Sequence, residues 1–395
     1  MKFNKVVFVR YFPLTKAIYT DLYFQELMQN NIQVEYLDIT SLFYPETIAT
    51  VPFEFAGTVK IASYKQLETY LKEQYNETIL YISLMTFEWR VFRLFRLFTK
   101  FNLNLAVFAR GVFPSSAEPD KKSKIVRVVK AINFERVAAF CANKITSLAK
   151  KGGFIKSYDY IFKAGEYGYW GLGIGSEIDV QKAKIVEVNT VDYDQFLLHK
   201  ELPSLHEEEY IVFLDQYLPY HPDASFLKIK TVESELYFKE VNGFFDRLEL
   251  VTGKKVIIAA HPKAERYKDF NPFNKRQIYF NQSNDLVREA SFVLTHASTA
   301  VCFPICYKKK IVLLVSDYLN EVLPQFLIVA KSIVNACDVT IIAMDKENEI
   351  HIPELINLSK YNDFNYKYLT SIESENQLSK DIFIHFLKSE DKSTQ

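Results

Sequence analysis

Short apolar runs alternate with segments of helical periodicity along the first half of the chain. Strands of a parallel sheet read as continuous apolar runs, because helices cover both faces of the sheet. The alternation and the short connections therefore predict a doubly wound, mostly parallel α/β sheet. The strands that we expect are 5–10, 32–39, 78–85, 104–110, 158–165 and 183–189, with helices at 14–30, 63–76, 86–101 and 118–151.

The same alternation resumes in the second half, after a segment with an acidic run that we interpret as an interdomain linker. A length of 395 residues suits two domains, each large enough for its own core. We expect a first domain over 1–200, a second over 208–375, and a last amphipathic helix and tail over 376–395 that packs back on the first. The second set of elements comprises strands at 210–214, 256–260, 277–282, 292–294 and 340–344, and helices at 225–251, 285–290, 298–307 and 319–336.

Polar clusters follow two of the strands expected in the second domain. His261-Pro262-Lys263 comes after one strand, and His296-Ala297-Ser298-Thr299 comes after another. Ligands of open α/β sheets bind outside the carboxyl ends of the strands, and a helix that starts at Ser298 or Thr299 offers backbone N–H groups to an anion. A plain helix cap and a strand-terminating turn are the alternatives. The pairing of the two clusters favours a ligand site.

Two acidic residues also stand at predicted strand ends. Asp215 follows the first strand of the second domain, and Glu166 lies in the loop GEYGYWGLGIG, which holds five of the eleven glycines. Glycines there permit close backbone approach to a ligand, so Gly165 and Glu166 are candidate site residues. Arg110, which ends the strand 104–110, is a candidate acceptor contact. A turn-capping aspartate and a surface glutamate are the alternatives.

Charge is distributed unevenly, although the net charge is zero. Residues 90–163 contain 16 Lys and Arg against 4 Asp and Glu, which leaves 32 against 44 for the rest. Such a block indicates an anionic partner such as lipid headgroups, a phosphorylated glycan or nucleic acid. It contains no recognisable nucleic-acid-binding module, so we expect no nucleic acid. Helix 86–101, with a stripe of Arg90, Arg93, Arg96 and Lys100, either lies on a membrane surface or covers the sheet as an ordinary helix, which we favour.

Several classes of protein are disfavoured by what the sequence lacks. The four cysteines form no CxxC pair and have no histidine at zinc spacing, so we expect a reducing compartment and no structural metal. A strand replaces a signal peptide at the start, and no apolar run reaches the length of a membrane span. We therefore expect a cytoplasmic chain. The first strand is not followed by G-x-G-x-x-G, so no NAD fingerprint is present.

These residues together carry a resemblance to a known family. Two α/β domains facing a cleft resemble the GT-B glycosyltransferases, and His261-Pro262 followed by Ser298-Thr299 resembles the HP and SS/ST motifs of bacterial transferases that use CMP-activated sugars. Glu166 in a glycine loop and Asp215 in VFLDQYLP look most like the retaining β-Kdo transferase branch. The resemblance implies that His261, Pro262, Lys263, His296, Ser298 and Thr299 bind the nucleotide.

The resemblance also implies a chemistry. Asp215 would be the nucleophile at the anomeric carbon and Glu166 the acid/base, while His261 would bind or protonate the departing phosphate. An inverting, sialyltransferase-like alternative uses Asp215 as general base and His261 as acid. We expect no metal cofactor, because CMP-sugars carry one phosphate, Lys263 supplies positive charge, and the one Asp-x-Asp motif that we single out, Asp192-Tyr193-Asp194, lies in the apparent linker.

The acceptor implied by the resemblance is an anionic or lipid-linked glycan of lipopolysaccharide or capsule. The basic region 90–163 would then bring the protein to the inner membrane as a peripheral contact. A UDP-sugar 2-epimerase, a nucleic-acid-binding protein and a non-catalytic scaffold are the other classes that remain open. The epimerase would bind UDP instead of CMP and need no acceptor.

Overall fold

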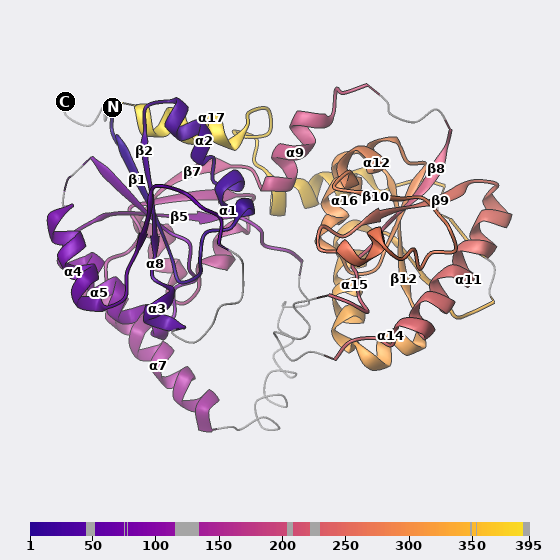
Figure 1. Cartoon of the computed structure of the whole chain (residues 1–395), viewed down its shortest axis with the longest axis horizontal. Coiled ribbons are helices and arrows are strands. Elements are labelled where there is room, and N and C mark those ends of the chain that lie inside the picture. Colours follow the sequence, from indigo (N-terminus) through magenta and orange to yellow (C-terminus); the bar gives the residue numbers. More distant parts are fainter. Residues whose placement is uncertain are drawn as a thin grey trace. The chain divides into compact units, whose positions relative to one another are not determined.

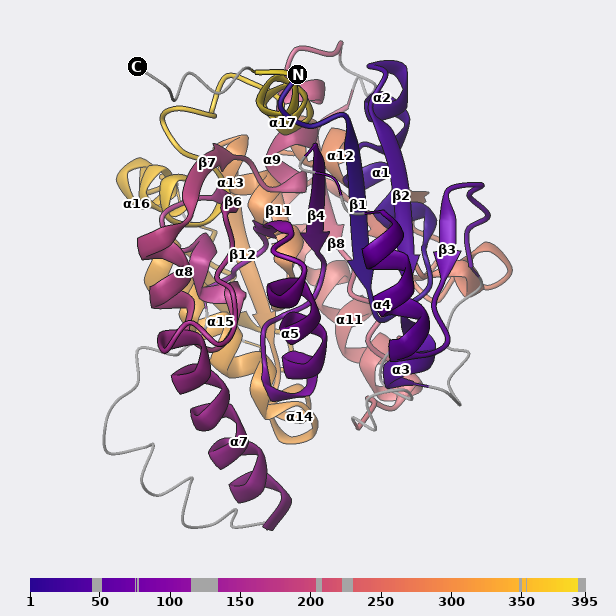
Figure 2. The same cartoon turned by 90° about the vertical axis from the view of Figure 1, so that its left-hand side faces the viewer.

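The structure is a computed structural model, and it describes residues 1–44, 52–74, 76, 78–114, 134–203, 208–221, 230–347, 350–352 and 354–389. The chain divides into two compact domains (Figures 1 and 2). The first contains the described residues up to Val112, those from 134 to Val191, and those from Thr370 onward. The second contains Phe113, Pro114 and the described part of Asp192–Leu369.

The first domain is built on a seven-stranded sheet in the order β3-β2-β1-β4-β5-β6-β7, with every neighbouring pair parallel. Successive side chains of a strand point to opposite faces, so Val7 and Val9 enter one core while Val6 and Phe8 enter the other. The strands are β1 (Lys5–Arg10), β2 (Gln33–Asp38), β3 (Thr58–Lys60), β4 (Ile79–Ser83), β5 (Asn104–Ala109), β6 (Tyr160–Ala164) and β7 (Lys184–Val188). The helices are α1 (Lys16–Asp21), α2 (Phe24–Gln29), α3 (Thr40–Phe43), α4 (Tyr64–Glu73), α5 (Phe92–Lys100), α7 (Phe134–Lys151), α8 (Ser176–Lys182) and α17 (Ser379–Lys388).

The second domain repeats this plan with a six-stranded parallel sheet in the order β10-β9-β8-β11-β12-β13. Its strands are β8 (Tyr210–Leu214), β9 (Lys255–Ala260), β10 (Ile278–Phe280), β11 (Phe292–Thr295), β12 (Lys310–Val315) and β13 (Thr340–Ala343). Its helices are α9 (Val191–His199), α11 (Ser234–Thr252), α12 (Ser283–Glu289), α13 (Cys302–Cys306), α14 (Asp317–Val322), α15 (Pro324–Cys337) and α16 (Leu358–Phe364). α9 begins at the boundary between the two domains.

Both strand orders confirm the predicted fold class of two Rossmann-like, doubly wound α/β domains. In each sheet the first strand of the domain lies between the second and the fourth, which is the Rossmann order 3-2-1-4-5-6. This order reverses direction beside the first strand. The resulting switch points lie between β1 and β4 in the first domain and between β8 and β11 in the second.

Four local predictions need correction. The helix expected at 319–336 is two helices, α14 and α15, which Leu323 separates. The helix expected at 14–30 is two helices, because Tyr23 adopts a left-handed conformation with φ 62° between them. The expected linker contains the helix α9, which carries Asp192-Tyr193-Asp194 in its first turn. The helix expected at 225–251 begins at Ser234, where the Glu233 carboxylate accepts two backbone N–H groups. Of the helix expected at 118–151, only the part from 134 lies within the described residues.

α5 is an ordinary sheet-covering helix, as favoured over a membrane-surface helix. Leu94, Phe95 and Phe98 are buried in the core of the first domain. The guanidinium of Arg93 lies 4.0 Å from the centre of the Tyr64 ring, and Nη1 of Arg96 donates to the carbonyl of Phe154 at 2.6 Å. Its basic stripe is therefore engaged within the domain.

The last helix, α17, completes the first domain. Phe383 and Phe386 pack edge-on against Phe162 of β6, with ring centroids 4.8 and 5.2 Å away. Asn189 holds the start of α17 and the residues before it through two hydrogen bonds. Its Nδ2 donates to the carbonyl of Gln377 at 2.7 Å, and its N–H donates to Ser379 Oγ at 2.9 Å. Residues nearly two hundred positions apart thus share one core.

Candidate active site at the strand ends of the second domain

The polar clusters predicted after separate strands lie side by side at the switch point of the second domain. β8 pairs with β9 on one side and with β11 on the other, so Leu214 is level with both Ala259 and Thr295. Asp215, the residue after β8, therefore stands between the ends of two neighbouring strands. Its N–H donates to the carbonyl of Ala259 at 3.1 Å, and Oε1 of Gln216 accepts the N–H of Ala297 at 2.9 Å.

Asp215 is a buried carboxyl group without a hydrogen-bond partner among the described residues. The residue is 5% exposed, and neither carboxylate oxygen makes a hydrogen bond. Burial raises the pKa of Asp215 to about 7. The backbone N–H groups of Tyr217 and His261 and the Tyr267 hydroxyl lie near enough to oppose this rise, but none of them forms a hydrogen bond with the carboxylate. A buried polar group left unpaired costs stability, so this carboxyl is a candidate functional group.

Tyrosine rings surround this carboxyl. Tyr217, held at φ 56°, packs edge-on against Tyr267 with ring centroids 5.0 Å apart. The Tyr267 hydroxyl is buried and has no hydrogen-bond partner among the described residues. Asp215 raises the pKa of both Tyr267 and Tyr237, after the larger effect of their burial. Asp215 thus lies at the predicted strand end, but it lies below the surface and cannot touch a substrate in this conformation.

His296 faces inward as well, which corrects its predicted role as a nucleotide ligand. Its ring is buried, and Nδ1 lies 2.7 Å from the carbonyl oxygen of Leu314 while Nε2 lies 3.1 Å from the Tyr237 hydroxyl. A carbonyl accepts only, so Nδ1 carries the proton and Nε2 accepts from Tyr237. Burial lowers the pKa of His296 to about 4. This neutral histidine supports the wall around Asp215.

His261 directly follows β9, and a neighbouring backbone group holds its ring. Its Nδ1 accepts the backbone N–H of Lys263 at 3.1 Å, which places the proton of the neutral ring on Nε2. The His221 ring packs against it, with centroids 4.9 Å apart. His261 is half-buried, whereas Pro262 and Lys263 are exposed. An N–H donor and an ammonium group therefore stand at the end of β9, as an anionic ligand requires.

Ser298 and Thr299 begin the helical segment after β11, as predicted. Ser298 Oγ accepts the N–H of Ala300 at 3.1 Å and caps a 3₁₀ turn, Thr299–Val301, that leads into α13. The hydroxyl of Ser298 thus acts as a helix cap. Thr299 is exposed and Ser298 half-buried, so both remain at the surface of the same sheet edge. Their predicted contact with a nucleotide stays a prediction.

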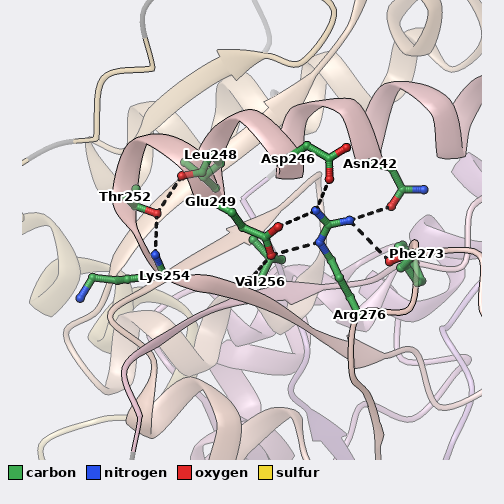
Figure 3. Close-up of polar contacts among 9 residues, drawn as sticks. All are labelled: Asn242, Asp246, Leu248, Glu249, Thr252, Lys254, Val256, Phe273 and Arg276. Atoms are coloured by element: carbon green, nitrogen blue, oxygen red, sulfur yellow. Dashed lines mark hydrogen bonds and ion pairs between the residues drawn. The ribbon is translucent and has the colours of Figure 1, made fainter.

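The loop that carries Tyr267 is fixed at its far end by Arg276 (Figure 3). Nη2 of Arg276 donates to Asp246 Oδ1 at 2.6 Å and to Glu249 Oε2 at 2.7 Å, both on α11. The same guanidinium donates through Nη1 to the carbonyl of Phe273 at 3.5 Å. The loop that follows β9 is therefore anchored to α11 through Arg276.

Two glycines of the loop after β6 are required for packing within the first domain. A Cβ added to Gly168 would lie 2.4 Å from the carbonyl oxygen of Ala109, and one added to Gly173 would lie 2.3 Å from that of Phe87. Gly168 and Gly173 thus permit close approach to the protein's own backbone, and the predicted ligand role of Gly165 stays a prediction. Glu166 follows Gly165, which has φ 66°, at the end of β6 and is exposed.

Arg110 directly follows β5, which ends one residue earlier than expected, and its guanidinium is occupied within the first domain. Nη1 donates to the Tyr23 hydroxyl at 2.8 Å and Nη2 to the carbonyl of Asp21 at 2.5 Å. It also stacks over the Phe108 ring at 4.7 Å. Arg110 therefore fixes the turn between α1 and α2. Its predicted acceptor contact stays a prediction.

Sequence reasoning misses the tyrosines of this site. Tyr267 lies in a short 3₁₀ turn after His261-Pro262-Lys263, where nothing in the pattern distinguishes it from other aromatic residues. Tyr237 occupies a position on the apolar face of α11 and reads as core. Gln216 reads only as a turn partner of Asp215, although it links the ends of β8 and β11. Within the described residues, no three His, Cys, Asp or Glu side chains form a possible metal site.

Comparisons with known proteins add the following. No protein-family model matches the sequence, and no curated protein matches it. Among solved structures, the UDP-GlcNAc 2-epimerase from Methanocaldococcus jannaschii is 13% identical, with a TM-score of 0.47 over 97% of this chain and 99% of that one. The calicheamicin glycosyltransferase CalG4 is 9% identical, with a TM-score of 0.44 over 98% and 94%. A putative UDP-N-acetylglucosamine 2-epimerase from Listeria monocytogenes is 10% identical, with a TM-score of 0.43 over 100% and 98%. These proteins are similar in fold alone, so the site rests on this chain's own residues.

Proposed function

We propose that this chain is a glycosyltransferase that binds a nucleotide-activated sugar at the switch point of its second domain. The observation that carries the proposal is the buried, unpaired carboxyl of Asp215 between His261 and the Ser298 turn. Sheets of this order bind nucleotides outside the carboxyl ends of their strands at this point. A carboxyl with a pKa of about 7 can exchange a proton near neutral pH.

The donor that we propose is a CMP-linked sugar acid of the Kdo type. Nε2–H of His261, the ammonium of Lys263 and the hydroxyl of Thr299 offer donors and one fixed positive charge to a single phosphate. A nucleoside monophosphate leaving group carries less charge than a diphosphate, so this donor set suits it without a metal ion. The resemblance of the His261-Pro262 and Ser298-Thr299 motifs to CMP-sugar transferases supports the same donor.

Asp215 is proposed as the nucleophile and Glu166 as the acid/base of a retaining transfer to a lipopolysaccharide or capsule glycan. Because the tyrosines cover Asp215, donor binding must displace Tyr217 or the 261–267 loop before the carboxylate reaches the anomeric carbon. The inverting alternative keeps Asp215 as a general base and needs the same opening. The anomeric configuration of the product, read by NMR, separates the two mechanisms.

Calorimetric titration with CMP and UDP tests the donor. We expect CMP to bind more tightly than UDP, and Lys263→Ala to weaken CMP binding by about 10- to 150-fold, since one charge-assisted contact contributes about 1.5–3 kcal/mol. Lys268→Ala is the matched control, because Lys268 is exposed in the same loop and pairs with Glu265. Tighter binding of UDP, with a sugar epimerised in the absence of acceptor, would instead establish the 2-epimerase class.

Transfer assays with CMP-Kdo test the assigned roles. Asp215→Asn and Glu166→Gln should each abolish transfer while CMP binding persists, since both residues are assigned to the sugar chemistry and not to the nucleotide. Glu177→Gln, on the exposed surface of α8 in the same domain as Glu166, should leave transfer unchanged. Full transfer by the Asp215→Asn enzyme would end the proposal.

A further inference from the structure

α7 turns its polar side chains toward the domain. Thr146 and Lys150 are buried, and Lys150 Nζ lies 2.5 Å from Asp179 Oδ2 with neither side chain exposed. Toward the start of the helix, Oδ1 of Asn143 accepts the backbone N–H of Trp89 at 3.0 Å. The inner face of this helix is therefore held by hydrogen bonds and an ion pair.

Its outer face is apolar. Phe140, Ile145 and Leu148 are 62%, 66% and 65% exposed. Positions three and four apart share one face of a helix, so Cys141 and Lys144, both exposed, lie on the same side. We call these five residues the α7 outer face. Figure 2 shows the N-terminal half of α7 extending past the body of its own domain.

This arrangement inverts the usual surface helix, which buries its apolar stripe and exposes its polar one. Phe154, 65% exposed, extends the apolar surface at the C-terminal end, where its N–H donates to the carbonyl of Ala149 at 2.9 Å. Contiguous exposed apolar side chains mark a surface that another body covers. None of the described helices is long and apolar enough to cross a membrane.

The charge beside this face decides what covers it. Lys144 and Lys151 are the exposed lysines of α7, whereas Lys150 is buried against Asp179 and Lys156, beyond the helix, pairs with Asp159 at 2.9 Å. The ammonium of Lys144 lies 5.4 Å from the centre of the Phe140 ring, and Lys151 is exposed at the end of the helix, 3.6 Å from Glu177 of α8. Two copies of the chain that met through this face would bring like charges together. An anionic surface accepts both the apolar side chains and the lysines.

We propose that the α7 outer face binds the surface of an anionic phospholipid bilayer. The apolar side chains enter the boundary between headgroups and acyl chains, and the lysine ammonium groups reach the phosphates, as in interfacial amphipathic helices. The contact locates the first domain at a membrane whatever the donor sugar proves to be.

Sedimentation with vesicles of phosphatidylcholine, with and without phosphatidylglycerol, tests the proposal on the full chain. We expect binding that requires phosphatidylglycerol, weakened about tenfold or more by Ile145→Ser with Leu148→Ser, since two buried side chains are lost. Lys144→Glu should weaken binding to the anionic vesicles. Leu250→Ser, which alters a leucine 86% exposed on α11, is the matched control and should bind as the unaltered protein does.

Cys141 provides a direct readout of insertion. It is exposed while Cys302, Cys306 and Cys337 are buried, so a polarity-sensitive thiol dye labels it selectively in the folded protein. A blue shift of the dye with anionic vesicles is expected. The proposal is overturned if the dye does not respond and the double serine variant sediments unchanged. It is equally overturned if this variant only dissolves a concentration-dependent dimer, because the covering body is then a second copy.

Discussion

The Tyr237 hydroxyl lies 3.1 Å from Nε2 of a buried His296, next to a carboxyl that has no hydrogen-bond partner of its own among the described residues. Burial moves the pKa of both ionisable groups toward their neutral forms, to about 4 for His296 and about 7 for Asp215. Between pH 4 and pH 7, both the His296 ring and the Asp215 carboxyl are therefore uncharged. The site is therefore least costly to bury in weakly acidic solution.

Asp215→Asn should stabilise the protein in alkaline solution. The folded pKa of Asp215 lies above the value of 3.8 expected when unfolded, so the folded state holds the proton longer and stability falls as pH rises from about 4 to about 7. A tenfold change in an acid's dissociation constant corresponds to about 1.4 kcal/mol, so the variant should gain several degrees in Tm at pH 8 and little at pH 4. Calorimetry at both pH values measures this, and equal gains would contradict the buried charge.

Tyr237→Phe should destabilise the second domain by about 1–3 kcal/mol, because it leaves His296 Nε2 buried without a donor. Urea unfolding measures the loss. Tyr279→Phe is the control, since the Tyr279 hydroxyl reaches Gln277 Oε1 at 3.2 Å in an exposed position, and it should change stability by less than about 0.5 kcal/mol. Equal effects of the two variants would show that His296 does not depend on this hydroxyl.

Lys150→Met should lower the free energy of unfolding by about 3–5 kcal/mol, because it leaves the buried carboxylate of Asp179 without its ion-pair partner. The Asp179 carboxylate also accepts the N–H of Tyr158 at 3.2 Å. Lys150→Met combined with Asp179→Leu should recover much of the loss. The exposed pair Lys151–Glu177, 3.6 Å apart, supplies the control, and Lys151→Met should cost at most about 1 kcal/mol. A double variant no more stable than the single one would argue against an isolated ion pair.

Gly168→Ala should destabilise the first domain by about 1–3 kcal/mol, because its Cβ would lie 2.4 Å from the carbonyl oxygen of Ala109. Gly171→Ala, in the same loop, would place its Cβ 3.7 Å from Val112 Cγ2, an ordinary contact. Thermal unfolding of both variants tests the difference. The prediction fails if Gly171→Ala is the more damaging of the two.

The positions of most strands can be predicted from the sequence, because a buried parallel strand is an uninterrupted apolar run. β1 and β8 match their expected ranges to the residue. Two strands are not predicted: the short edge strand β3, since three residues carry no period, and β12, although its run is apolar and continuous. The left-handed turn at Tyr23 was missed for another reason: an aromatic residue there gives no breaker signal.

The sequence predicts where the candidate site residues stand in the sheet, but not how exposed their side chains are. The position of Asp215, His261 and Ser298 follows from parallel strands ending at one sheet edge, which depends on chain order alone. Burial of Asp215 and His296 depends on Tyr217, Tyr237 and Tyr267, which arrive from other elements. The packing role of Gly168 and Gly173 cannot be predicted, because the carbonyls of Ala109 and Phe87 that they approach are brought to them only by tertiary packing.

The packing of α17 on β6 has a consequence for biosynthesis. Phe386 of α17 shares the core of the first domain with Phe3, although the second domain lies between them in the sequence. While the second domain is being translated, Tyr160 and Phe162 of β6 lack the aromatic contacts that α17 provides. The first domain is thus completed only after the second, and the nascent protein carries uncovered aromatic side chains on β6 until α17 has been made.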